Sequence, residues 1–242
     1  MRLSNNSDRP MNYSIDKNMQ FPLVNINLDA GERVFIQSGS MVYHDTSVDL
    51  STHLNGKGHG LHKLFSAVGR SFTSGENMLI TQAEAQGRPG TIALAPNVPG
   101  EILPLELGQE QYRINDGAFL AMDGASSYSM KLQSVSKALF SGTGGFYVMT
   151  TSGNGVVLCN AYGSIREIDL DNSEITIDNN HVVAWSTSLD YDIHLENGLF
   201  QSFGTGEGIV NTFKGTGKVY IQSLNLESFA ESLMPFLPDK SN

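Results

Sequence analysis

Apolar runs around closely spaced glycines recur three times in this chain of 242 residues. The clearest copy lies at 206–221, where two apolar runs flank a Gly-Thr-Gly sequence; similar stretches lie at 144–158 and, more loosely, at 75–94. The closing glycines are spaced 65 and then 62 residues apart, at Gly90, Gly155 and Gly217. Each stretch is typical of a β-hairpin, and the spacing predicts three copies of one β-rich module.

A second signature precedes each predicted hairpin, at 39–43, 117–121 and 180–184. We therefore expect a loose N-terminal segment at 1–12, followed by three modules with pseudo-threefold symmetry. The expected modules are 13–108, 109–170 and 171–242. Because the first module is about 13 residues longer between its two signatures, it is expected to carry an insertion near 55–72.

Short strands separated by turn residues fill most of the chain. Val24, Ile26 and Leu28 alternate with asparagines, which is the pattern of a half-buried strand. Two separate strands are likewise expected at 163–170 and 174–177. Many such strands with little helix predict an all-β fold built as a sandwich, a barrel or a β-helix.

Two short helices are the expected exceptions. Apolar residues in the insertion fall at i, i+3, i+4 and i+7, which predicts a helix that either closes the end of a sheet or forms a lid or contact surface. These residues are Leu61, Leu64, Phe65 and Val68. Near the C-terminus, Asn225 is expected to cap a helix at 226–233 that Pro235 ends.

The charge balance disfavours nucleic acid as a partner. The chain carries 15 Lys and Arg against 25 Asp and Glu, a formal net charge of −10, which would repel a phosphate backbone. We interpret the acidic residues between 166 and 192 as a solvated strand face rather than a cation site. Five aromatic residues are expected in the core rather than in a base-stacking groove: Phe146, Tyr147, Trp185, Phe213 and Tyr220.

The single cysteine, Cys159, excludes an internal disulfide and is expected to be buried and unreactive. One free thiol favours a reducing compartment. The N-terminal residues have neither the apolar core of a signal peptide nor the character of a transit peptide. Since no apolar run approaches the roughly 18 residues of a membrane helix, we expect a cytoplasmic protein without a transmembrane segment.

No recognisable reaction centre stands out, so we assign no catalytic, cofactor or metal site. The best candidate is a histidine group with two neighbouring aspartates: His44, His53, His59, His62, Asp45 and Asp49. Imidazole and carboxylate suit zinc or iron, but the spacings are irregular and no His-x-His pair occurs. Nucleophile-elbow, phosphate-loop and calcium-loop patterns are also missing.

The repeated motifs resemble those of the altered-inheritance-of-mitochondria family (number twenty-four), bacterial proteins of unknown function with a fungal mitochondrial relative. The matching stretches are 39–43, 90–100, 117–121, 178–184 and 206–217. The resemblance implies a fold like that of the tryptophan RNA-binding attenuation protein, with double-stranded β-helix modules and ring-shaped oligomers, and no established enzymatic activity. The chain departs from the family's most regular form at Gly144-Gly145, where 206–208 has Gly-Glu-Gly.

Two functions remain open from the sequence. The favoured one is a non-catalytic scaffold, a homotrimer whose ring surface meets a protein or a membrane-associated partner. The alternative is a small-ligand or metal-binding protein that uses the His-rich first module, including His53, His59 and His62. A monomer whose terminal helix covers its open sheet edge is the alternative to the trimer, because an uncovered edge invites pairing with another chain.

Overall fold

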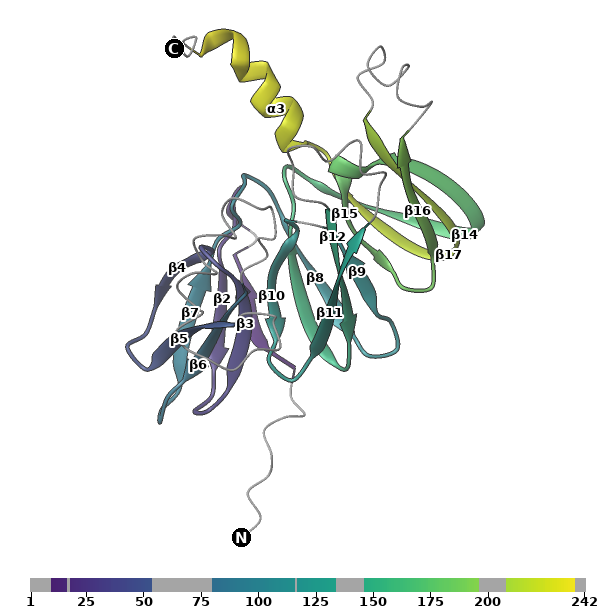
Figure 1. Cartoon of the computed structure of the whole chain (residues 1–242). Coiled ribbons are helices and arrows are strands. Elements are labelled where there is room, and N and C mark those ends of the chain that lie inside the picture. Colours follow the sequence, from purple (N-terminus) through teal and green to yellow (C-terminus); the bar gives the residue numbers. More distant parts are fainter. Residues whose placement is uncertain are drawn as a thin grey trace.

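The computed structural model describes residues 10–16, 18–53, 80–115, 117–133, 146–195 and 208–237, which form an almost all-β molecule (Figure 1). Its strands are β1 (Asn12–Ile15), β2 (Val24–Leu28), β3 (Arg33–Gln37), β4 (Met41–His44), β5 (Val48–His53), β6 (Ile80–Ala85), β7 (Gly90–Leu94), β8 (Ile102–Leu107), β9 (Tyr112–Ile114), β10 (Phe119–Asp123), β11 (Ser127–Gln133), β12 (Phe146–Ser152), β13 (Gly155–Asn160), β14 (Ile165–Asp178), β15 (Val182–Ser186), β16 (Asp190–Leu195) and β17 (Ile209–Gln222). Its helical elements are the 3-10 turns η3 (Asn179–His181) and η4 (Met234–Phe236) and the helix α3 (Leu226–Leu233).

The described strands form three hydrogen-bonded sheets, whose pairings are antiparallel. One sheet has the order β1-β2-β7-β4, and a second has the order β5-β6-β3-β10-β13-β8. The third has the order β11-β12-β9-β15-β17-β14, with β16 also paired to β17. The all-β fold expected from the short alternating strands is therefore confirmed.

Each of the central strands pairs with two neighbours. In the first part of the chain, β7 lies between β2 and β4, and β6 lies between β3 and β5. In the second part, β13 lies between β8 and β10, and β12 lies between β9 and β11. In the last part, the C-terminal half of β17 pairs with β15 and the first half of β14, and its N-terminal half pairs with β16 and the second half of β14.

The prediction of hairpins at the three glycine-marked stretches is wrong. β6 and β7 lie in different sheets, and so do β12 and β13. In the third stretch, β17 runs without interruption from Ile209 to Gln222, and Gly215 and Gly217 lie inside it with φ values of +123° and +158°. Gly90 and Gly155 therefore mark corners at which the chain passes from one sheet to another, whereas Gly215 and Gly217 mark a corner inside one strand of the third sheet.

The expected pair of strands at 163–170 and 174–177 is likewise a single strand, β14. Its register with β17 is irregular between Leu170 and Ser173, where Asn172 adopts a φ of +45°. Such a bulge bends a strand without ending it, so β14 turns the same corner as β17 beside it.

Gly90, Gly155 and Gly217 are needed for close approach at these corners. They stand opposite Leu28, Leu107 and Leu170 in the strand register. A Cβ atom at Gly155 would lie 2.8 Å from Asp123 Oδ2, and one at Gly217 would lie 2.7 Å from Ser188 Oγ. At Gly90 the added atom would collide with Ser47 Oγ. Glycine leaves the room in which each corner packs against a neighbouring turn.

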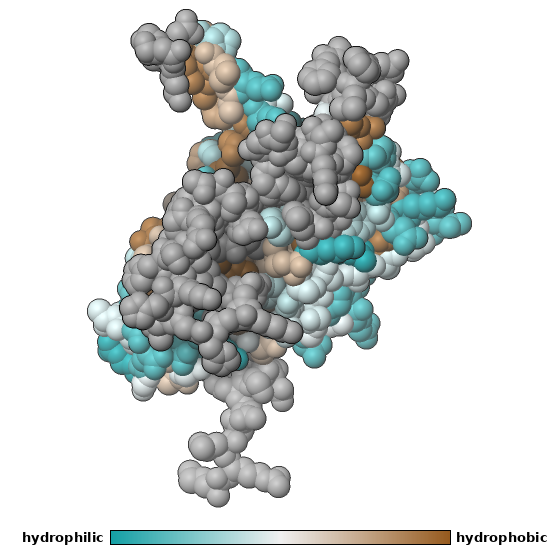
Figure 2. Space-filling model, in the orientation of Figure 1, coloured by the Kyte–Doolittle hydropathy of each residue, from teal (hydrophilic) through white to brown (hydrophobic). Residues whose placement is uncertain are grey.

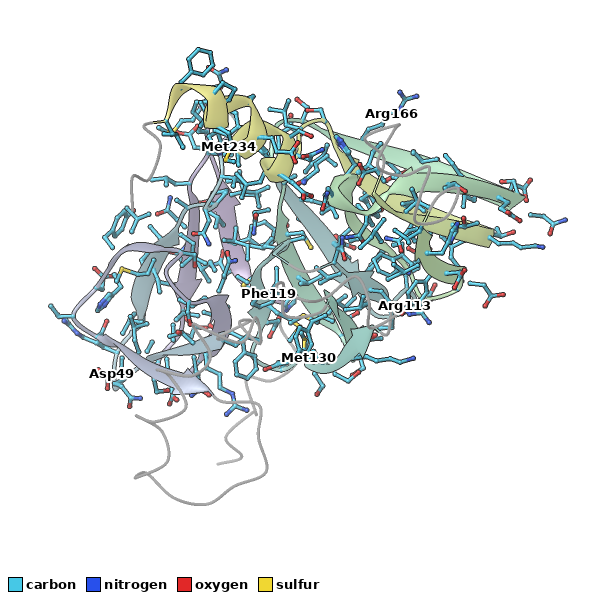
Figure 3. All side chains as sticks on the ribbon, turned by 45° about the horizontal axis from the view of Figure 1, so that its top comes forward. Asp49, Arg113, Phe119, Met130, Arg166 and Met234 are labelled. Carbon is cyan, nitrogen blue, oxygen red and sulfur yellow. The ribbon has the colours of Figure 1, made fainter. Side chains whose placement is uncertain are left out.

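The core consists of apolar clusters between the sheets. Phe119 lies near the middle of the molecule in Figure 3 and is fully buried. Trp185 packs edge-on against Tyr191 and Phe213, with ring centroids 5.0 and 5.3 Å apart. Trp185, Phe213 and Tyr220 are buried, as the sequence predicts.

The two ends of the chain differ in their packing. Asn12 begins β1, which pairs with β2, and Met11 is buried with its N–H donating to Asp123 Oδ2 at 2.8 Å. The described end of the expected loose segment is thus packed. The insertion predicted at 55–72 lies outside the described residues. None of the helices in the described part of the chain has the length and hydrophobicity to cross a membrane.

Candidate assembly surface

The histidine group does not form a metal site in the described residues. His44 is exposed on β4, and its Nδ1 lies 2.9 Å from the Asp45 carbonyl oxygen. The Asp45 carboxylate accepts a hydrogen bond from the Thr91 N–H at 2.8 Å. His53 ends β5, while His59 and His62 lie outside the described residues. Within the described segments, no three His, Cys, Asp or Glu side chains gather closely enough to hold an ion.

Cys159 lies on β13 and is fully buried, as expected. Burial raises the pKa of its thiol to about 12, because the apolar surroundings disfavour the thiolate. The thiolate, not the thiol, is the nucleophile. Because Cys159 stays protonated at neutral pH, it is unsuited to covalent chemistry there.

A cavity of about 360 Å³ lies beside β10 and β15 and is lined largely by amide side chains. Those amides are engaged with the backbone: Asn115 Nδ2 donates to the carbonyl oxygens of Asn179 and Val182 at 2.9 and 3.1 Å. Asn160 Nδ2 donates to the Gly117 carbonyl oxygen at 3.2 Å. The buried Oδ1 of Asn115 has no hydrogen-bond partner among the described residues. The arrangement holds the turns that precede β10 and β15, and we assign it a structural role.

The acidic stretch of β14 is a solvated strand face, as interpreted from the sequence. Glu167, Asp169, Asp171 and Glu174 are all exposed. The Lys218 ammonium donates to Glu167 Oε1 at 2.6 Å and lowers the pKa of that carboxyl. An exposed ion pair of this kind contributes little to stability.

The apolar strand β4 is exposed along its whole length. It pairs with β7 on one side and with no described strand on the other. Met41, Val42 and Tyr43 are 38, 50 and 51% exposed. An edge strand that is apolar and carries no proline is a template for pairing with another chain.

The second half of β14 is a further open edge. Among the described strands, residues 173–178 pair with β17 only, and Ile175 and Ile177 are half-buried. Figure 1 shows β4 at one end of the molecule and β14 at the opposite end. The two open edges are therefore separated within one chain.

At two other places, strand edges are covered by strands of the same chain. β3 pairs with β10, and β9 pairs with β15. Beside the first junction, the rings of Phe35 and Tyr128 meet edge to face with centroids 6.2 Å apart. Beside the second, the Arg113 guanidinium lies over the Tyr191 ring at 5.1 Å and donates to the Leu189 carbonyl oxygen at 3.1 Å.

The C-terminal helix α3 begins where the sequence predicts it. The Asn225 side chain accepts a hydrogen bond from the Ser228 N–H at 2.7 Å. No residue of α3 is buried, and its apolar stripe faces outward as a brown band in Figure 2. Figure 3 shows Met234 on this projecting segment. The helix is thus an exposed apolar surface, and the idea that it covers an open sheet edge is wrong.

Sequence and structure comparisons agree on the relationships of the chain. The family model described as mitochondrial biogenesis AIM24 matches residues 13–224. An uncharacterized protein of Streptococcus pyogenes serotype M6 is 60% identical over 235 residues, which cover 97% of this chain and 94% of that protein. A crystal structure of a Streptococcus pyogenes protein, solved by structural genomics, superposes with a TM-score of 0.81 at 58% identity and covers 94% of this chain and 100% of that one.

Proposed function

The chain belongs to the mitochondrial biogenesis AIM24 family, and we propose that it is a non-catalytic scaffold, a homotrimer that presents a β-rich surface to a protein or membrane-associated partner. The observation that carries the proposal is the exposed apolar strand β4, which a second chain would cover. The net charge of −10 argues against a nucleic-acid partner. The single buried thiol supports a reducing, cytoplasmic setting.

The proposed architecture is three copies of one module. Its support is the pairing scheme: β7 and β6 in the first part of the chain, β13 and β12 in the second, and the two halves of β17 in the third each lie between two equivalent neighbours. The turn glycines Gly90, Gly155 and Gly217 occupy equivalent register positions in this scheme. β8 pairs with β13, so we place the first boundary before Ile102 rather than at 108. The second boundary lies before Ile165.

Light scattering coupled to size exclusion tests the assembly. The expected mass is three times the 26.3 kDa of one chain. A mass equal to one chain at micromolar concentration contradicts the scaffold, because an isolated chain leaves β4 uncovered. Elemental analysis of the same sample tests the non-catalytic assignment, since a stoichiometric transition metal would favour a metal-dependent protein instead. A pull-down from the source organism would then identify the partner.

A further inference from the structure

The proposed repeat contains two sets of three equivalent strands, one that includes β4 and one that includes the second half of β14. Under the proposed module repeat, on which this inference rests, β4, β10 and β15 are equivalent, and so are β3, β9 and residues 173–178 of β14. Inside the chain, β3 pairs with β10 and β9 pairs with β15. Among the described strands, β4 and residues 173–178 of β14 are left without such a partner. We propose that β4 of one copy pairs with residues 173–178 of a second copy, and that this antiparallel junction joins the subunits.

The bulges fix which residues correspond. β4 is irregular between Met41 and Tyr43 in its pairing with β7. β10 and β15 are irregular at the same place in their own pairings, between Phe119 and Ala121 and between Val182 and Ala184. Tyr43, Ala121 and Ala184 are therefore equivalent.

The internal junctions then set the register of the proposed one. Ala121 stands opposite Ile36, and Ala184 stands opposite Ile114. Ile36 lies seven residues before Tyr43, and Ile114 lies seven residues before Ala121. Ile177 lies seven residues before Ala184, so it is equivalent to these two isoleucines. Tyr43 of one copy is thus predicted opposite Ile177 of the next. The following pair is His44 opposite Thr176, which corresponds to the observed pairs Met122–Phe35 and Trp185–Arg113.

Burial supports the missing neighbour. Where a preceding strand covers the position, the residues are buried: Phe119, Leu120 and Ala121 in β10 are 0% exposed. Their counterparts in β4 are the exposed Met41, Val42 and Tyr43. The apolar residues of β4 are therefore exposed where no described strand covers them, while their counterparts in β10 are shielded by β3.

The exposure of Leu50 in β5 supports the same missing strand. Seven residues after Ala121, Tyr128 packs against Phe35, and seven residues after Ala184, Tyr191 packs beneath Arg113. Leu50 holds the equivalent position in β5, and it is 39% exposed. Thr176 of a second copy occupies the place of Phe35 and Arg113, so the proposed junction covers Leu50 as well as β4.

Three of the other described outer strands carry residues that oppose such pairing. β8 contains Pro104, which lacks an N–H to donate. β11 carries Lys131, and β16 carries Asp190 and Asp192. Charged residues and proline are the usual means by which edge strands avoid pairing with other chains. β4 has neither, and its apolar residues are exposed, whereas those of β1, which also has neither, are half-buried.

The junction joins different surfaces of the two subunits. The two edges lie at opposite ends of the molecule (Figure 1). Each subunit therefore offers one β4 edge and one β14 edge. Contacts of this head-to-tail kind close into a ring when the rotation per subunit permits and otherwise propagate as a filament. Backbone hydrogen bonds supply affinity in such strand addition, and the side chains supply register.

Disulfide trapping tests the junction and its register. A chain carrying both His44→Cys and Thr176→Cys is oxidised under native conditions and run on a non-reducing gel. Cα atoms directly opposite in an antiparallel pair lie about 4.5–5.5 Å apart, within the range that a disulfide spans. We expect covalent dimers and higher species in at least tenfold excess over the wild-type chain. Cys159 does not compete, because it is fully buried.

The single variants supply the controls. His44→Cys alone and Thr176→Cys alone should stay monomeric on the gel, while an equal mixture of the two should give a dimer and nothing larger. Pairing His44→Cys with Glu174→Cys, two residues out of register, should cross-link at least fivefold less. Cross-linking of either single variant would replace the proposal with a symmetric contact. If light scattering shows an oligomer but the double variant does not cross-link, the junction is wrong and the scaffold stands; a monomer defeats both.

Discussion

Single glycines decide where this chain can turn a tightly packed corner. A side chain at Gly217 would meet Ser188, Ser186 and Leu189 at 2.7–3.1 Å, and its φ of +158° disfavours β-branched residues. Gly217→Val is expected to lower the free energy of unfolding by more than about 1 kcal/mol. Gly208→Val is the control, because no atom lies within 4 Å of its added Cβ. Equal denaturation midpoints for the two variants would show that packing at the corner does not require glycine.

Tyr220 gives the fold a dependence on alkaline pH. Burial, with the neighbouring Glu167 carboxylate as a further cause, raises its pKa from 10.0 to about 12. The unfolded state releases its phenolic proton first as pH rises, so stability should be full below about pH 10 and should fall between pH 10 and 12. Denaturation of Tyr220→Phe across this window should show a smaller fall than that of the wild type. Parallel curves would assign the alkaline loss to other groups, of which Tyr112 is one, since burial raises its pKa as well.

At the scale of elements, we expect α3 to add little to the stability of the rest of the protein. Its side chains are exposed, and its attachments are confined to the first turns, where Asn180 Nδ2 donates to Glu227 Oε2 at 2.7 Å and Phe229 meets Tyr162 edge to face. Leu233→Gln together with Phe236→Gln should change the free energy of unfolding by less than about 0.5 kcal/mol. The same variant should lose any partner that a pull-down recovers through the helix. A large loss of stability would mean that the apolar stripe packs against the protein in solution.

At the scale of the whole molecule, assembly should contribute to stability. If subunits bury β4 against one another, mass action makes the thermal midpoint depend on protein concentration. A hundredfold increase in concentration is worth up to about 2.7 kcal/mol by that linkage, which corresponds to roughly 5 °C or more for a chain of this size. Scanning calorimetry at two concentrations measures it. A midpoint that does not move, in a sample that scatters as a trimer, would show that the subunit contacts add nothing to folding.

The amino-acid sequence by itself determined the elements that depend on local patterns. Alternation of apolar and polar residues located strands such as β2, and Asn225 with Pro235 located α3, because strand periodicity and helix capping are properties of adjacent residues. The burial of Cys159 followed in the same way from the apolar run around it.

Only the tertiary structure decided what the strands pair with. Apolar runs around Gly215 and Gly217 look alike whether the chain folds back on itself or bends and continues, since the two outcomes differ in which distant strand lies alongside. The sequence therefore predicted hairpins where there are corners. The exposure of β4 was equally hidden, because Met41, Val42 and Tyr43 belong to the same repeated signature as their buried counterparts, and only the sheet order shows that no described strand covers them. Strand pairing joins residues far apart in the chain, and no local pattern encodes which edge is left open.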